Sequence, residues 1–319
     1  MKSLRKLFNK INIEGKLLFD ENLAKHCTFK IGGNADVFAI PSNVRDMEII
    51  LSEVKKAGVP YCVLGEGANI LFSDSGFSGV IISTANLAGV SVKENIVSAE
   101  AGVKISDLAE LSCKSFLAGL EYFFGMPGTA GGAIFMNARC FGQSVSDILH
   151  KVIYINKDGD LSEYKADKKD FDYKVSPFQK NSGIILSAEF ILKKIADEVT
   201  EKDKEKRKLA LFEKMAEFKR ERESKGHYAY PSAGSVFKNN RDFGEPTGKI
   251  IDSLGLRGFS VGGAMVSPLH ANIIVNGSGN ALAKDVKELV TLIEEKVYKA
   301  YGFTLEREII YACTDIFQC

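Results

Sequence analysis

Features that would mark several classes of protein are missing from this 319-residue sequence. It has no excess of one charge, because 42 Lys and Arg residues balance 41 Asp and Glu residues, which argues against a nucleic-acid-binding protein. It also has no long apolar run. Lys10, Glu14 and Lys16 interrupt the basic N-terminal segment, and no stretch approaches the ~18 uncharged apolar residues of a membrane-spanning helix. We therefore expect a cytoplasmic protein with no membrane span and no nucleic-acid partner.

Histidine and cysteine are too sparse for common metal and disulfide chemistry. The four histidines form no H-E-x-x-H motif, so the sequence predicts no metal site. The six cysteines are scattered and form no C-x-x-C pair. A disulfide framework is typical of small secreted chains, and this chain is much longer. We expect all six cysteines to be free thiols in a reducing cytosol.

Hydrophobic residues are abundant and follow patterns of both helix and strand. They make up 45% of the chain, which is enough to bury a sizeable core in two or three domains. Residues 36–84 follow a β-α-β-β pattern with a helix over 43–58, and strand patterns dominate from 88 to 190 around a helix at 104–119. These alternations predict a mixed α/β (α+β) protein.

A change in composition separates the C-terminal third from the rest. Residues 193–225 are dense in charge of both signs and are predicted to form a helical connector with one solvated face. Residues 226–305 then alternate strand and helix, and the last helix places apolar residues at 286, 289, 290, 293 and 297. A terminal strand is predicted over 304–312.

Two glycine-rich loops are the first candidates for ligand binding. "GEGAN" (65–69) follows a predicted strand, but Ile70 stands where the dinucleotide fingerprint needs a third glycine. "GMPGTAGG" (125–132) has four glycines, which let backbone N–H groups approach an anion closely. Neither loop contains a lysine, so a triphosphate site is disfavoured. The pair suits a pyrophosphate held by backbone dipoles, with ordinary turn glycines as the alternative.

Two further stretches carry polar side chains of possible chemical use. In "YPSAGSVFKN" (230–239), Ser235 is outside a G-x-S-x-G elbow and has no predictably placed histidine, which disfavours a hydrolase nucleophile. A serine can still donate a proton from a fixed position, and the alternative is a small-residue turn with a packed Phe. In "LEREI", Glu306 and Glu308 are two apart on a predicted strand and share a face. Taken alone, both are ordinary surface carboxylates.

Seven segments, in this order along the chain, resemble the UDP-N-acetylenolpyruvoylglucosamine reductase (MurB) family, the flavoenzymes of peptidoglycan precursor synthesis. The resemblance runs from about residue 22 to residue 312. One glycine loop can arise by chance, but seven segments in the family's order are very unlikely to. The segments are "TFKIGGNADVF", "VLGEGANILFSDSGFSGVII", "GLEYFFGMPGTAGGAIFMNA", "YPSAGSVFKN", "GKIIDSLGLRGFSVGGAMVS", "HANIIVN" and "LEREI".

The resemblance implies a division of the chain. It implies a two-part FAD-binding unit of the vanillyl-alcohol-oxidase/p-cresol-methylhydroxylase type, followed by a C-terminal α/β substrate domain. The first FAD-binding part is expected at 18–84 and 306–319, and the second at 85–195. The helical connector is expected at 196–225, and the UDP-sugar domain at 226–305.

The resemblance also implies an activity. The family uses NADPH and non-covalently bound FAD to reduce UDP-N-acetylglucosamine enolpyruvate to UDP-N-acetylmuramate. That sugar nucleotide and NADPH are therefore the expected small-molecule partners, and we expect a monomer. Two alternatives stay open: another flavin oxidoreductase of the same fold, such as an oxidase, or a flavin-binding protein without turnover.

Three positions correspond to the family's catalytic residues, and one of them departs in residue type. Ser235 corresponds to the proton donor and Glu308 to the glutamate of the terminal strand. Lys174, in "FDYKVSPF", stands where the family has arginine. Lysine keeps the positive charge but lacks the planar two-donor fork that grips a carboxylate. A slower or retuned active site is the interpretation we favour over a lost activity.

The resemblance implies binding residues as well. The implied cofactor-binding residues are Gly65, Gly67, Asn69, Gly125, Pro127, Gly128, Thr129, Gly131, Gly132 and Asn137. The implied substrate-binding residues are Tyr173, Lys238, Asn239 and His270.

Two other departures from the family concern the rim of the site. Arg139 and Cys140 stand where many relatives have Gly-Ala, which makes Cys140 either an inert packing residue, the interpretation we favour, or a reactive thiol. No tyrosine occurs between residues 187 and 227. The chain therefore resembles the shorter subtype of the family, which lacks a tyrosine-bearing lid.

Overall fold

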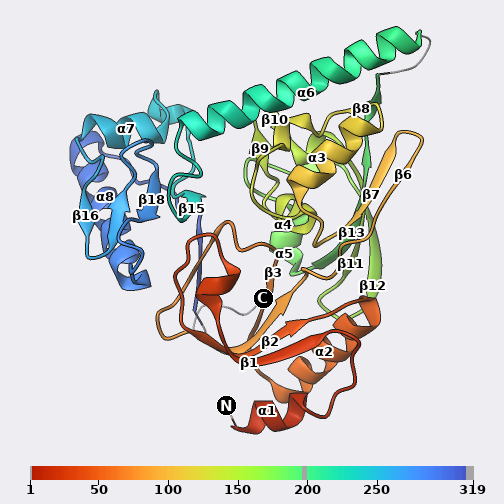
Figure 1. Cartoon of the computed structure of the whole chain (residues 1–319). Coiled ribbons are helices and arrows are strands. Elements are labelled where there is room, and N and C mark those ends of the chain that lie inside the picture. The colour runs from red at the N-terminus through yellow and green to blue at the C-terminus, as the bar shows by residue number, and fades with distance from the viewer. Residues whose placement is uncertain (1, 196–199, 314–319) are drawn as a thin grey trace.

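The computed structural model describes residues 2–195 and 200–313. Residues 196–199 of the predicted connector and residues 314–319 of the predicted first FAD-binding part, with Cys319, lie outside the described residues. The described chain forms three regions, named here the N-terminal region (residues 2–83), the middle region (90–194) and the C-terminal region (232–301). Figure 1 shows the N-terminal region at the base, the other two above it, and one long helix across the top.

The N-terminal region is a four-stranded sheet with two helices. Its strand order is β1–β2–β5–β3; β1 is antiparallel to β2, whereas β2, β5 and β3 are parallel. Helix α2 begins after Asn43, whose side chain accepts a hydrogen bond from the Asp46 N–H, and it ends at Gly58 with φ 62°, as the sequence predicts. The bounds are α1 (Lys2–Phe8), β1 (Lys16–Asn22), β2 (Asn34–Ile40), α2 (Val44–Ala57), β3 (Tyr61–Leu64), β4 (Ile70–Phe72) and β5 (Phe77–Ser83).

The middle region is an antiparallel five-stranded sheet in the order β12–β11–β13–β7–β6. The helix predicted over 104–119 is shorter in the structure, because Phe116 adopts a left-handed φ of 58° and the chain then turns into a short strand. The strands are β6 (Val90–Lys93), β7 (Ile96–Glu100), β8 (Leu117–Ala118), β9 (Arg139–Cys140), β10 (Gln143–Ser144), β11 (Leu149–Ile155), β12 (Leu161–Lys165), β13 (Ile184–Ile191) and β14 (Lys193–Lys194). The α-helices are α3 (Ile105–Lys114), α4 (Ala130–Phe135) and α5 (Pro177–Asn181).

Helix α6 (Glu201–Ser224) crosses from the middle to the C-terminal region (Figure 1). Thr200 caps it by accepting a hydrogen bond from the Asp203 N–H. Met215 is its one fully buried residue among those described. The helix expected within 193–225 is therefore present, but it starts only at Glu201, and Lys193 and Lys194 form strand β14 instead. It packs a narrow stripe while most of its surface meets water.

The C-terminal region is an antiparallel sheet covered by two helices. Its strand order is β15–β18–β17–β16. The predicted apolar stripe of α8 is confirmed, because Val286, Leu289, Val290, Ile293 and Val297 are all buried. The bounds are β15 (Ser232–Ser235), α7 (Thr247–Ser253), β16 (Ser260–Val261), β17 (Ala264–Val266), β18 (Ile273–Asn276) and α8 (Ala283–Tyr301).

The chain then returns to the N-terminal region. The strand predicted over 304–312 is confined to β19 (Ile310–Ala312), which pairs in parallel with β4. The preceding residues do not form a regular ladder, because the Glu308 and Ile309 N–H groups both donate to the Val236 carbonyl. Glu308 is therefore held between the C-terminal and N-terminal regions.

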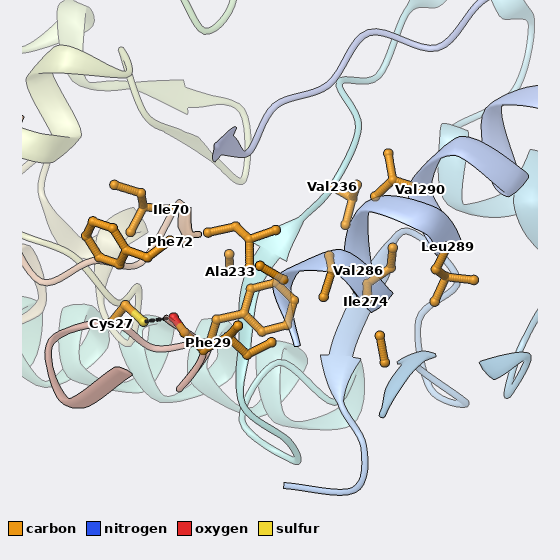
Figure 2. Close-up of a cluster of buried hydrophobic side chains, with 14 of the residues drawn as sticks. Cys27, Phe29, Ile70, Phe72, Ala233, Val236, Ile274, Val286, Leu289 and Val290 are labelled. Carbon is orange, nitrogen blue, oxygen red and sulfur yellow. Dashed lines mark hydrogen bonds between the residues drawn. The ribbon is translucent and has the colours of Figure 1, made fainter. Parts of the chain in front are cut away.

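The described chain has three hydrophobic cores, two of which join one region to another. One is shared by the N-terminal and C-terminal regions, where Phe29 and Phe72 lie near Ala233 and Val236 (Figure 2). A second fills the middle region, and a third joins the N-terminal sheet and its helices to β11 and β13. In the described part of the chain, no helix is both long enough and apolar enough to cross a membrane, and the five described cysteines form no disulfide.

Candidate active site

A cavity of about 1210 Å³ lies where the three regions meet. It exceeds the roughly 300–1,000 Å³ of a pocket for one small ligand, so it has room for a cofactor and a substrate together. Most of the residues singled out from the sequence line it: Gly65, Gly67, Asn69, Pro127, Gly128, Thr129, Gly131, Gly132, Tyr173, Lys174, Ser235, Asn239 and Glu308. The fold therefore brings segments from five separate parts of the sequence to one site.

The first glycine loop is closely packed against its surroundings. A Cβ atom at Gly67, where φ is +67°, would lie 2.4 Å from the His26 carbonyl oxygen. A Cβ at Gly65 would lie 2.5 Å from Thr129 Oγ1, so the two glycine loops touch at this point. Asn69 donates from Nδ2 to the Glu308 carbonyl at 3.0 Å. The loop therefore also fixes the terminal segment that carries Glu308.

The second glycine loop leaves space for a ligand. A Cβ at Gly128, where φ is +127°, would meet no protein atom within 4 Å. Thr129 caps α4, its hydroxyl accepting from the Gly132 N–H at 3.3 Å. The Gly128 N–H donates to the Glu66 carboxylate at 2.6 Å, and Lys104 lies 3.6 Å from the same carboxylate. The open space at Gly128 fits a ligand such as FAD lying along these loops, whereas the Gly128 N–H and Lys104 are both engaged by Glu66 in this conformation.

An ion pair crosses the cavity between Lys174 and Glu308. Lys174 Nζ lies 2.5 Å from a Glu308 carboxylate oxygen, and the side chains are only 15% and 11% exposed. Lys174 has a left-handed φ of 60°, which is unfavourable for a long side chain. Reciprocal backbone hydrogen bonds between Asp172 and Val175 hold this turn, and Gln179 donates from Nε2 to the Lys174 carbonyl at 3.1 Å. The strained turn aims the ammonium group at the carboxylate.

Ser235 ends β15 at the opposite wall. Gly234 before it has φ +74°, and the pairing of β15 with β18 is irregular there, so the strand turns as it reaches the cavity. The Glu308 N–H donates to the carbonyl of Val236 at 2.7 Å. Ser235 and Glu308 are thus held on neighbouring backbones and line the same cavity as Lys174.

A smaller pocket of about 200 Å³ opens beside Ser235. Asn239 lines both cavities, and its Oδ1 accepts from the Thr247 N–H at 2.9 Å. His270 lines the smaller pocket, and its Nδ1 accepts from the Asn272 N–H at 3.2 Å. Burial lowers the pKa of His270, assisted by the charge of Lys225. The ring is therefore a neutral hydrogen-bonding group near neutral pH.

Three predicted binding residues lie outside the lining of both cavities. Lys238 forms an ion pair with Glu306 at 2.5 Å. The Gly125 N–H donates to the Ser106 hydroxyl, and the Gly125 carbonyl accepts from the Tyr228 hydroxyl. These contacts give both residues structural roles in this conformation.

The third of these, Asn137, supports the turn that carries Lys174. It is buried with a φ of 39°, and its Nδ2 donates to the Asp172 carbonyl at 2.8 Å. Its Oδ1 accepts from the Ser146 N–H at 3.2 Å. The side chain therefore connects the segment after α4 to the Lys174 turn.

Two residues that the sequence did not single out also line the main cavity, Arg222 and His227. His227 lies 5.7 Å from His270 between ring centroids. Burial, with a contribution from the charge of Arg222, lowers the pKa of His227 to about 4. Neither residue belongs to a motif that sequence reasoning recognises, and their place at the end of α6 is visible only in the fold.

Comparisons with known proteins agree with this arrangement. Residues 226–312 match the family model for the C-terminal domain of UDP-N-acetylenolpyruvoylglucosamine reductase, and residues 35–164 match that for an FAD binding domain. UDP-N-acetylenolpyruvoylglucosamine reductase of Borrelia garinii is 40% identical over 98% of this chain and 97% of the relative. That of Treponema denticola is 41% identical over 94% of each chain. The crystal structure of the Thermus caldophilus reductase superposes with a TM-score of 0.75 at 29% identity, covering 94% of this chain and 99% of that one.

Proposed function

Because the chain belongs to the UDP-N-acetylenolpyruvoylglucosamine reductase family, we propose that it reduces the enolpyruvyl group of UDP-N-acetylenolpyruvoylglucosamine, with FAD as cofactor and NADPH as the source of hydride. The product would be UDP-N-acetylmuramate, a precursor of peptidoglycan. The family and the mixed α/β fold class predicted from the sequence are confirmed. The observation that carries the proposal is the meeting of Ser235, Lys174 and Glu308 in one cavity with both glycine loops.

The two glycine loops would hold the cofactor. When bound, FAD supplies the hydride-transfer chemistry that amino-acid side chains lack. Gly65, Gly67 and Asn69 from the first loop, and Gly128 and Thr129 from the second, line the cavity where its pyrophosphate and flavin would lie. Pro127, Gly131 and Gly132 complete that wall. Gly125 and Asn137 would act from outside the lining, by shaping the loop.

Ser235 would complete the reduction by donating a proton. Hydride addition to one alkene carbon of the substrate leaves negative charge on the other, which is conjugated to the carboxylate. The Ser235 hydroxyl would protonate that carbon, since a carbanion is basic enough to accept a proton from a serine. Lys174 and Glu308 would position the substrate carboxylate and stabilise the enolate-like charge. Tyr173 and Asn239 would orient the sugar nucleotide from the cavity, and His270 from the smaller pocket.

An anaerobic visible spectrum tests the proposed activity. NADPH should bleach the flavin band of the purified protein, and UDP-N-acetylenolpyruvoylglucosamine should then restore it. Restoration by oxygen and not by the sugar nucleotide would identify an oxidase. A flavin that NADPH fails to reduce would identify a binding protein without turnover. Either result would contradict the proposal.

Lys174 is the residue whose role is tested most directly. Lys174→Arg should preserve or raise kcat, because arginine offers two donors to a carboxylate. Lys174→Ala should lower kcat about 100- to 1,000-fold by removing one electrostatic stabiliser. Lys180→Ala, on the exposed surface of the neighbouring helix α5, is the matched control. Loss of activity in Lys174→Arg with flavin still bound would show that this residue does not occupy the arginine position.

We further propose a monomeric, cytoplasmic enzyme of the shorter subtype, divided as the resemblance implies. The first FAD-binding part would be 18–84 with 306–319, the second 85–195, the connector 196–225 and the substrate domain 226–305. The absence of tyrosine between 187 and 227 supports the subtype. Light scattering after size exclusion would test the monomer, since a dimer would double the expected 34.9 kDa.

A further inference from the structure

Arg222, in the last turn of α6, has an incomplete set of partners. Its Nη2 donates to Cys140 Sγ at 2.9 Å, and its Cζ lies 5.3 Å from the centroid of the Phe141 ring. Its Nε is buried and has no hydrogen-bond partner. Among residues 2–195 and 200–313, it is the one buried side-chain nitrogen or oxygen atom that has no hydrogen-bond partner. A buried donor without an acceptor is costly, so it calls for an explanation.

Two other cations at the cavity wall are neutralised by acids, whereas Arg139 and Arg241, which also line the cavity, are exposed. Lys174 pairs with Glu308, and Lys104, just outside the lining, pairs with the lining residue Glu66. No ion pair in the described part of the chain includes Arg222. A thiol is a weak acceptor, and the face of a phenylalanine ring gives a modest attraction. Arg222 is therefore a cavity-lining cation with one unsatisfied buried donor, Nε, and a weak acceptor at Nη2.

We propose that Arg222 binds a phosphate group of a nucleotide that enters the cavity. The inference rests on the proposed function, because both the UDP-sugar and NADPH present such phosphates. On binding, the guanidinium would turn from Cys140 and donate from Nε and one Nη to two phosphate oxygens. That fork geometry is the one in which arginine binds phosphate best.

The surroundings of Arg222 favour phosphate over the substrate carboxylate. Ser235, Lys174 and Glu308 already form a site for the reacting end of the substrate. The described contacts of Arg222 are Cys140, Phe141 and the vicinity of Gly125, and none is acidic. Burial, with a smaller contribution from the charge of Arg222, lowers the pKa of His227, which lines the same cavity. A nucleotide could thus place its phosphates here and extend its reacting group toward Ser235.

Ligand affinity measured without turnover tests the inference. The holoenzyme would be titrated with UDP-N-acetylglucosamine, NADP⁺ and uridine, with the flavin spectrum or calorimetry as the readout. Arg222→Ala should weaken binding of a phosphate-bearing ligand about 10- to 100-fold, the effect of losing charge-assisted hydrogen bonds. Uridine, which has no phosphate, should bind the variant as it binds the native protein. Weakening of the UDP ligand or of NADP⁺ identifies which nucleotide uses the residue.

Two control variants keep the test decisive. Arg220→Ala removes an exposed arginine two residues away on α6 and should leave both affinities unchanged. Arg222→Lys keeps the positive charge but lacks the two-donor geometry of the guanidinium, so it should bind the phosphate-bearing ligands with intermediate affinity. If the alanine variant does not fold, the lysine variant tests the proposal in its place.

Changes below about threefold in both phosphate ligands would overturn the inference. The inference would also be overturned if Arg222→Ala lost FAD or shifted the flavin spectrum while its affinities for both nucleotides stayed unchanged. Arg222 would then contact the cofactor and not a nucleotide substrate. The binding titration needs no turnover. An inactive native protein would therefore be detected by the spectral assay of activity and not by this titration.

Discussion

The C-terminal region meets the other two regions in different ways. Against the N-terminal region it shares a continuous apolar core, to which Phe29 and Phe72 contribute from one region and Ala233 and Val236 from the other (Figure 2). Toward the middle region its connection is the mostly solvated helix α6 (Figure 1). Lys214 of that helix pairs with buried Glu121 at 3.1 Å, and aromatic contacts flank the pair.

Polar contacts reinforce the apolar junction, the contact between the N-terminal and C-terminal regions. Asp74, on the loop after β4, accepts hydrogen bonds from the Ala283 and Lys284 N–H groups at the start of α8. The Thr28 hydroxyl donates to the Ser232 carbonyl at 2.6 Å. The C-terminal region is therefore fixed to the N-terminal region at its sheet and at its longest helix.

The difference determines how firmly each of the three proposed catalytic residues is held. Ser235 and Glu308 belong to segments fixed at the apolar junction, whereas Lys174 belongs to the middle region. Their ion pair spans the cavity between the regions. A motion of the middle region relative to the C-terminal region would separate Lys174 from Glu308 and open the cavity, whereas Ser235 and Glu308 would move together.

Removing a large side chain from the shared core should have the greatest effect. Phe29 has no exposed surface, and Phe29→Ala should lower the free energy of unfolding by about 3–5 kcal/mol through lost burial and a cavity. The N-terminal and C-terminal regions should still unfold in one transition. Denaturant titration, monitored by far-UV circular dichroism and by tyrosine fluorescence, would measure it. Leu209→Ala, at a side chain 59% exposed on α6, is the control and should be nearly neutral. Separate transitions for the two regions would contradict a shared core.

Acid should weaken the cavity wall near α6. The pKa of His227 is about 4 in the folded protein and about 6.5 in the unfolded chain. As pH falls from about 6.5 to about 4, the unfolded chain therefore binds this proton first, and the folded state loses stability. The shift corresponds to at most about 3 kcal/mol. Denaturation at several pH values should show this loss in the native protein and a smaller one in His227→Gln. A His150→Gln control, on an exposed part of β11, should keep the native pH dependence.

Local elements were predictable because their signals are local. Helix α2 matches its predicted range to within a residue at each end, since Asn43 and Gly58 supply its caps. The stripe of α8 follows from helical periodicity alone. The helix predicted to residue 119 was too long, because tertiary pairing of β8 with β14 outweighs the helical pattern there.

The site could be predicted only in part. The resemblance identified Ser235, Lys174 and Glu308 as members of one site, but neither composition nor spacing places residues 174 and 308 within 2.5 Å of each other. Glu306 and Glu308 share a pattern in the sequence, yet Glu306 is 71% exposed and pairs with Lys238, whereas Glu308 is 11% exposed and lines the cavity. Arg222 and His227 carry no motif at all, because their importance depends on where α6 ends.

The ion pair between Lys214 of α6 and Glu121 of the middle region should contribute least to stability. Lys214→Gln leaves the Glu121 side chain, which is 5% exposed, without its cation. Because Lys214 itself is 36% exposed, the cost should be about 1–2 kcal/mol, below that of a fully buried pair. Glu121→Gln in the same background should recover part of the loss, and the double-mutant cycle gives the coupling between the two residues. Hydrogen exchange should quicken along α6 and remain unchanged in α8, because α8 is held by the apolar junction. Equal acceleration in both helices would mean that the two junctions share one cooperative unit.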